Sequence, residues 1–161
     1  MKKLFLLYCI LLSSFTLSYC QKSKGVSTGV SKCGLSMKQG VCGTIIWKEG
    51  NQMPSPDRPQ SSAKGVARDV VVYEITRLDQ VESDGGFHRN IKTKLIKKVS
   101  SDSKGNFCLN LPEGQYSIFV WEDGKGLYAN SFDGKSNIFP ITVRKGKVEL
   151  ITITVDYMAA Y

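Results

Sequence analysis

The sequence predicts an all-β protein, a Greek-key antiparallel β-sandwich of about seven strands. From residue 41 onward, short runs of alternating apolar and polar residues follow one another at fairly even spacing. Gly, Pro and Asp residues separate these runs, and no segment keeps a helical apolar period for more than a turn or two. Several half-apolar strands bury their apolar faces best as two packed sheets, so a sandwich is expected.

The order of the runs predicts how the chain folds back on itself. Residues 70–75 are apolar on both faces, as in a central strand that is covered on both sides. Asp102 and Gly105 bound a predicted type I turn, and residues 106–111 and 116–121 are predicted to form a hairpin. Residues 138–143 and 148–155 are predicted to form a terminal hairpin. Strands are also predicted at residues 41–47, 67–78, 91–100 and 127–133, and long loops at 49–65 and 79–90.

The N-terminus predicts export. Lys2 and Lys3 precede a short apolar run over residues 4–12 and a Ser/Thr-rich stretch that ends at Cys20, which is the layout of a signal peptide over residues 1–20. Two endings fit: Cys20 is lipidated, as at a bacterial lipobox, or the chain is simply cleaved beside it, since Tyr19 stands where the lipobox has a small residue. Residues 21–38 are predicted to form a flexible tail, and residues 39–157 one domain.

The expected location is therefore the periplasm, outer membrane or cell surface of a bacterium, with membrane contact only through an N-terminal lipid. The formal net charge is +8. The densest basic cluster, Lys92, Lys94, Lys97 and Lys98, largely alternates with apolar residues, so it is interpreted as the solvated face of a strand. Nucleic acid is not an expected partner.

Five cysteines are present, and the signal peptide accounts for Cys9 and Cys20. Cys33, Cys42 and Cys108 remain in an oxidising compartment, which allows one disulfide and one leftover thiol. Cys42 and Cys108 each lie within a predicted strand, on the side opposite its apolar residues, so a Cys42–Cys108 bridge is favoured. A bridge from Cys33 to Cys42 remains the alternative.

Three motifs occur in order along the chain: VCGTI at residues 41–45, DSKGNF at 102–107 and LPEGQY at 111–116. Together they resemble the carboxypeptidase regulatory-like domains, which are small transthyretin-like (prealbumin-like) Greek-key sandwiches. The resemblance covers residues 40–156. It implies an accessory module that accompanies peptidases or surface proteins without performing the chemistry, because the matching motifs supply turns and core positions.

An enzyme is not expected. His88 is the only histidine, whereas the metal-dependent and hydrolytic enzymes of this fold use several. No nucleophile elbow, phosphate-binding loop or zinc-ligand cluster occurs, and neither a cofactor nor a metal is predicted. One alternative is a small hydrolase with His88 beside an acid or a thiol. Another is a calcium-stabilised sandwich that uses loop acids, namely Glu82, Asp84, Asp102 and Asp133.

The expected function is a non-catalytic exported module that mediates protein or glycan binding, or structural assembly, at the cell envelope. Aromatic residues near strand ends supply flat rings for stacking, and polar loop residues supply orientation. The candidate binding residues are Trp47, Asp57, Arg58, Trp121, Tyr128, Asn130, Phe132 and Asp133. The structural alternative is that Trp47 and Trp121 cap the two ends of the core. A further alternative is a subunit that pairs an edge strand with a larger surface complex.

Overall fold

The computed structural model describes residues 37–54 and 63–161. The signal peptide, Cys20, Cys33, Asp57 and Arg58 lie outside the described residues, as does most of the tail. The elements in chain order are β1 Gly40–Asn51, β2 Lys64–Gly65, β3 Asp69–Glu74, the 3₁₀ turn η2 Leu78–Gln80, β4 Glu82–Asp84, β5 Phe87–Arg89, β6 Leu95–Ser100, β7 Asn106–Leu109, β8 Gly114–Glu122, β9 Gly126–Tyr128, β10 Pro140–Val143 and β11 Val148–Ala160.

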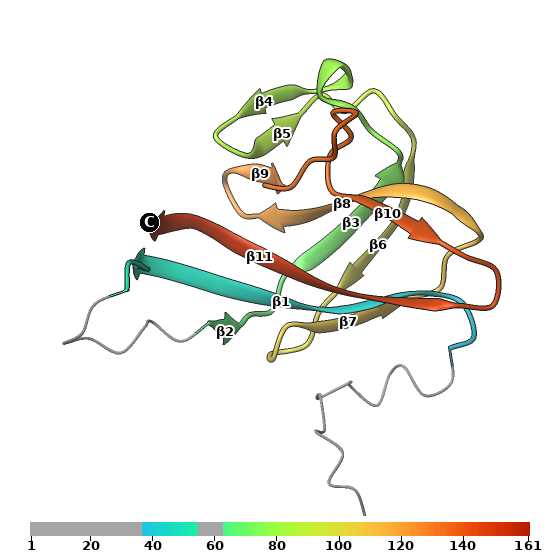
Figure 1. Cartoon of the computed structure of the whole chain (residues 1–161), viewed down its shortest axis with the longest axis horizontal. Coiled ribbons are helices and arrows are strands. Elements are labelled where there is room, and N and C mark those ends of the chain that lie inside the picture. The colour runs from blue at the N-terminus through green and yellow to red at the C-terminus, as the bar shows by residue number, and fades with distance from the viewer. Residues whose placement is uncertain (1–36, 55–62) are drawn as a thin grey trace, which may run out of the picture.

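Two sheets form the sandwich (Figure 1). The smaller sheet has the order β11-β1-β2, with β7 also paired to β1, and the larger has the order β4-β5-β9-β8-β3-β6, with β10 also paired to β8. The all-β sandwich prediction is confirmed. Most pairings are antiparallel, but β1 and β11 run parallel from the pair Gly40–Val148 to the pair Asn51–Ala160. The short strands β2, β4 and β5 lie in the two segments predicted as loops.

The main core lies between the two sheets because alternate residues of each strand point inward. Val41 and Ile45 of β1 face Val70 and Val72 of β3, and all four are fully buried. The predicted inward residues Phe107, Leu109 and Leu111 are buried in the same cluster.

A second apolar cluster covers the outer face of the larger sheet. Val71 and Phe119 point outward from β3 and β8, and Leu127, Ala129 and Ile138 pack against them. The prediction of a central strand covered on both sides is therefore confirmed for β3, whereas Ile75 lies beyond its end. The second cluster does not extend over Trp121, which remains 41% exposed. A groove lies between Trp121 and the residues that cover the sheet.

Both predicted hairpins are wrong. β7 pairs with β1 whereas β8 pairs with β3, so residues 110–113 cross from one sheet to the other. Likewise β10 pairs with β8 and β11 with β1. Alternation and a turn show only that a chain reverses. They do not show whether the next strand joins the same sheet or the facing one.

Two cysteines link the strands of the smaller sheet. Cys42 of β1 and Cys108 of β7 are register partners with Cα atoms 4.1 Å apart, and they form a disulfide. This is the pairing that the strand pattern favours. Because both residues lie on the side of the sheet opposite the core, the bridge fastens β7 to β1 without displacing core side chains.

Candidate functional site

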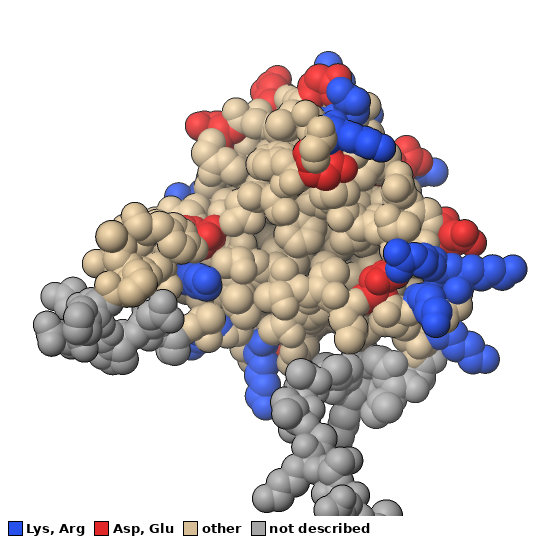
Figure 2. All heavy atoms as spheres, viewed as in Figure 1, with Lys and Arg blue, Asp and Glu red and all other residues tan. Residues whose placement is uncertain are grey.

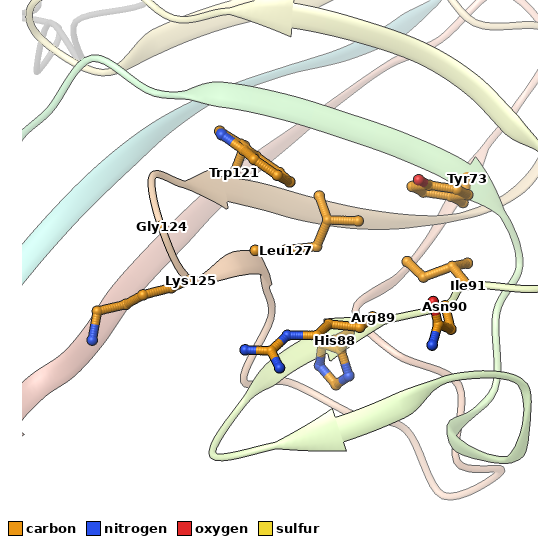
Figure 3. A pocket seen from close by; sticks show the side chains of 10 residues that line it. Tyr73, His88, Arg89, Asn90, Ile91, Trp121, Gly124, Lys125 and Leu127 are labelled. Carbon is orange, nitrogen blue, oxygen red and sulfur yellow. The ribbon is translucent and has the colours of Figure 1, made fainter.

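A groove of about 450 Å³ opens on the outer side of the larger sheet, beside the second apolar cluster (Figure 3). We call it the Trp121 groove. Trp121 from β8 and Tyr73 from β3 lie on one side, Arg89 and Asn90 lie on the other, and Leu127 lies between them. The complete lining is Tyr73, His88, Arg89, Asn90, Ile91, Trp121, Gly124, Lys125, Gly126 and Leu127.

Two aromatic rings in the groove are held in fixed orientations. The Trp121 Nε1–H donates to Asp123 Oδ1 at 3.0 Å, which restrains the indole while leaving much of it exposed. The half-buried Tyr73 ring packs edge-on against Phe119, with 5.6 Å between ring centroids. Restrained rings lose little conformational entropy when a ligand covers them, so this side of the groove is preorganised for stacking.

His88 lies against the floor of the groove but is only 1% exposed. Its Nε2 is 3.0 Å from the carbonyl oxygen of Ala129, an acceptor, so Nε2 carries the hydrogen. Its Nδ1 then accepts from the Ser83 hydroxyl at 2.8 Å. Burial lowers the pKa of His88, against the opposing effect of the Ala129 hydrogen bond, so the neutral ring is favoured.

The arrangement around His88 bears on the hydrolase alternative. Both ring nitrogens are engaged, and the groove lining contains no carboxylate and no thiol. The acid or thiol that the hydrolase alternative places beside His88 is therefore not in the groove lining. The imidazole instead joins β4, β5 and the segment after β9, which fixes one wall of the groove.

Arg89 and Lys125 give the groove a basic rim. Arg89 is exposed at the end of β5. The Lys125 Nζ lies 4.7 Å from the centroid of the Tyr157 ring and 5.6 Å from that of Phe87. The two basic residues also line a neighbouring hollow of about 370 Å³ that contains Asp84, Phe87 and Tyr157, so they form a ridge between the two depressions.

A cluster of aromatic rings closes one end of the sandwich beside that hollow. Trp47 packs edge-on against Tyr157, with 5.1 Å between centroids, and Phe87 contacts both Tyr128 and Tyr157. The Tyr157 hydroxyl donates to the buried Glu122, which also pairs with Arg68 at 2.8 Å. Trp47 therefore acts as a core cap, as the structural alternative predicts, whereas Trp121 lies outside the core.

Asp156 organises the polar side of this end. The hydroxyls of Tyr128 and Tyr161 and the amide of Asn130 donate to its carboxylate at 2.6–2.8 Å. Burial disfavours the charged form, but these hydrogen bonds and the charge of Lys48 outweigh it and lower the pKa of Asp156. Burial, followed by the contact with Asp156, raises the pKa of Tyr128. The Asp156 carboxylate thus accepts three hydrogen bonds from within the protein.

The predicted site residues do not converge. Trp121 lines the groove, whereas Trp47 and Tyr128 belong to the aromatic end cluster, and Asn130 binds Asp156. Phe132 is 45% exposed and its ring centroid lies 6.2 Å from that of His88. Asp133 accepts hydrogen bonds from the backbone and side chain of Asn137, so it serves as a turn cap.

Sequence reasoning missed the residues that complete the groove with Trp121, namely Tyr73, Arg89, Asn90, Ile91, Lys125 and Leu127. The sequence does contain a signal for Tyr73. Val70 and Val72 point inward, so alternation places the next residue, Tyr73, on the outer face of the strand. Arg89 and Asn90 were not identifiable, since they lie in a segment predicted as a loop. That segment forms the β4–β5 hairpin and is carried to the groove by the pairing of β5 with β9.

The loop acids of the calcium alternative do not form a metal site in the described residues. In residues 37–54 and 63–161, no group of three or more His, Cys, Asp or Glu side chains is placed to hold a metal ion. Asp102 accepts from Lys104 and Asn106 within its own turn, as Asp133 does from Lys135 and Asn137. The described part of the chain also contains no helix that is long and apolar enough to cross a membrane.

Comparison of the chain with protein-family models, curated proteins and solved structures finds no match.

Proposed function

We propose that this protein is a non-catalytic, exported module of the bacterial cell envelope that binds a glycan through the Trp121 groove. The observation that carries the proposal is an exposed, orientationally restrained tryptophan at the edge of a shallow groove of about 450 Å³. Such a groove combines an apolar floor with a few polar groups, which is how proteins bind small ligands and sugars.

Two features of the groove favour a glycan over an extended peptide. β9 borders the groove and is hydrogen-bonded on both sides, to β5 and to β8, so it has no free backbone edge that could pair with a peptide strand. The polar contacts available are side chains, among them Asn90 and Arg89. Side-chain donors beside a flat ring suit a ligand whose polarity is carried by hydroxyl groups.

The remaining parts of the proposal rest on the sequence. The N-terminal layout over residues 1–20 supports export, with or without lipidation of Cys20. The resemblance of residues 40–156 to carboxypeptidase regulatory-like domains supports an accessory role without chemistry of its own. The groove lining holds neither an acid nor a thiol beside His88, which is consistent with that role.

The test is an array of immobilised envelope and extracellular polysaccharides, probed with the full chain and two variants. Trp121→Ala removes the exposed ring from the groove, and we expect its affinity to fall about tenfold or more. Phe132→Ala is the matched control, because Phe132 is exposed to a similar extent but does not line the groove. Saccharide binding that Trp121→Ala leaves unchanged would show that the groove is not the site. Absence of binding across the array would reject the glycan function.

A second candidate function is assembly through an exposed strand edge. β11 is 13 residues long and, among the described strands, pairs only with β1. Leu150 and Met158 on this strand are 66% and 58% exposed. A long unpaired edge can accept a strand from another protein. Partner binding that survives Trp121→Ala but is lost in Leu150→Lys would favour this function over the first.

A further inference from the structure

Arg89 presents a guanidinium group without an internal partner. It is exposed at the end of β5, and among the described residues it makes neither an ion pair nor a side-chain hydrogen bond. Glu82 is its cross-strand neighbour on β4, but the two side chains do not form an ion pair. An unpaired guanidinium beside a groove is available to a ligand, and its planar donors match the two oxygens of a carboxylate.

The charges around the Trp121 groove favour an anionic ligand. The lining includes Arg89 and Lys125 and no acidic residue. The adjacent acid Asp123 is engaged by the Trp121 indole N–H. The neighbouring hollow, which shares both basic residues, does contain a carboxylate, Asp84. Of the two depressions beside Arg89 and Lys125, the Trp121 groove is therefore the one whose lining would not repel an anionic group.

The spacing of the two rings indicates a ligand longer than one sugar. Trp121 is paired with Asp69, and Tyr73 with Ser117, so the two rings lie four residues apart along neighbouring strands. Four residues of a strand span about 13 Å. A single sugar ring cannot contact both side chains over that distance, whereas a chain of several sugars can.

We propose that the Trp121 groove binds a linear acidic saccharide, with a sugar ring on Trp121 and a carboxylate on Arg89. This inference rests on the proposed glycan-binding function and specifies its ligand class. Lys125 lies on the same ridge with its ammonium over Tyr157 and Phe87, so it adds positive charge to the surroundings without contacting the ligand. Tyr73 contacts the chain further along. Binding is then controlled by two separable contacts, one apolar and one ionic.

The test compares each acidic polymer with its own neutral form. Polygalacturonate, alginate and hyaluronate are used beside their methyl-esterified forms, which keep the sugar backbone and lose the charge. Affinity of the full chain is measured by titration calorimetry at physiological ionic strength, where non-specific attraction is screened. We expect at least one acidic polymer to bind about tenfold more tightly than its ester.

Two variants separate the ionic contact from general charge. Arg89→Gln is expected to bind the acidic polymer and its ester equally. Lys145→Gln removes one positive charge from the exposed turn between β10 and β11, away from the groove lining, and is expected to keep the preference. Figure 2 shows that basic side chains gather over that turn. Lys145→Gln therefore removes a charge from a strongly basic region that does not line the groove.

The outcomes separate this inference from the function on which it rests. Equal binding of acid and ester by the unmodified chain, with loss in Trp121→Ala, would keep the glycan function and reject the acidic ligand. Equal weakening by Arg89→Gln and Lys145→Gln would show that net positive charge alone attracts the polymer, which also rejects it. Absence of binding to every acidic polymer would overturn the inference, while the polysaccharide array decides the function itself.

Discussion

At the scale of single residues, burial decides what each polar side chain can do. His88 is buried, neutral and hydrogen-bonded at both nitrogens, whereas Arg89, the next residue, is exposed and without an internal partner. Adjacent strand residues point to opposite faces, so the histidine contributes to the fold and the arginine to the surface. The two tryptophans divide in the same way: Trp47 packs with Tyr157 and Trp121 faces the groove.

His88 should make stability depend on pH near neutrality. Its folded-state pKa is lowered, mainly by burial, so the unfolded chain takes up a proton at higher pH than the folded chain does. Stability should therefore be fully present above about pH 6.5 and decrease as the pH falls below that value toward the folded-state pKa. Urea unfolding at pH 7.5, 6.5 and 5.5 measures this slope.

The matched variant for this measurement is His88→Gln, because His88 is the only histidine in the chain. The variant is expected to be less stable at every pH but to show a flat profile between pH 7.5 and 5.5. Asp69, Asp102, Asp133 and Asp156 have lowered pKa values, so their contributions are lost only at more acidic pH, below about 4. The same slope in both proteins would exclude His88 as its source.

At the scale of elements, two turns of the chain have the same chemistry. Residues 102–106 read DSKGN and residues 133–137 read DGKSN. In each turn the Asp carboxylate accepts from the backbone two and four residues later and from the Asn side chain. These bonds, led by the one from the Asn side chain, lower the pKa of both Asp residues. The two turns differ at the second position, which holds Ser103 or Gly134, and at the fourth position.

Gly105 and Ser136 occupy the fourth position in the left-handed conformation, with φ of 81° and 63°. This conformation is costly for a residue with a Cβ atom, so Ser136→Gly should raise the free energy of unfolding by about 0.5 to 1 kcal/mol. Gly105→Ala is the reverse test. A Cβ there would overlap the carbonyl oxygen of Ile45, and we expect a loss of about 2 kcal/mol or more.

Thermal and urea unfolding of the two variants check this comparison. The opposite signs of the two changes in unfolding free energy matter more than their magnitudes. Both residues have the same backbone conformation, and only their surroundings differ. Ser136 is exposed, and replacing it with Gly only removes atoms. Gly105 instead lies against β1, whose Ile45 N–H donates to the Gly105 carbonyl oxygen at 2.8 Å. A destabilised Ser136→Gly would mean that the Ser136 side chain contributes more than its backbone conformation costs.

At the scale of the whole molecule, the chain crosses repeatedly between the two sheets. β6 and β7 are consecutive yet lie in different sheets, and the same holds for β7 and β8 and for β10 and β11. The smaller sheet therefore gathers strands that are distant in sequence, such as β1 and β11, so its formation needs long-range contacts. Closing such loops costs chain entropy, which a disulfide within that sheet reduces in the unfolded state.

The Cys42–Cys108 disulfide joins residues 66 positions apart. For a loop of that length the chain-entropy model predicts a stabilisation of up to about 4 kcal/mol. We expect the Cys42→Ser/Cys108→Ser variant to lose about 2 to 4 kcal/mol in urea unfolding, and Cys33→Ser to lose none. A loss below about 1 kcal/mol in the double variant would show that the denatured chain already brings β1 and β7 together.

Alternation and turn residues alone predict the all-β class, the inward positions of Phe107, Leu109 and Leu111, the central two-sided strand β3, the Asp102 turn and the favoured cysteine pair. These depend on alternation and local turn chemistry, which act over a few residues. The folded structure is needed to show that β7 and β8 separate into different sheets, that β11 runs parallel to β1, and that Arg89 and Trp121 line the same groove. Those arrangements depend on which strands pair at long range, and every alternation pattern is compatible with several such pairings.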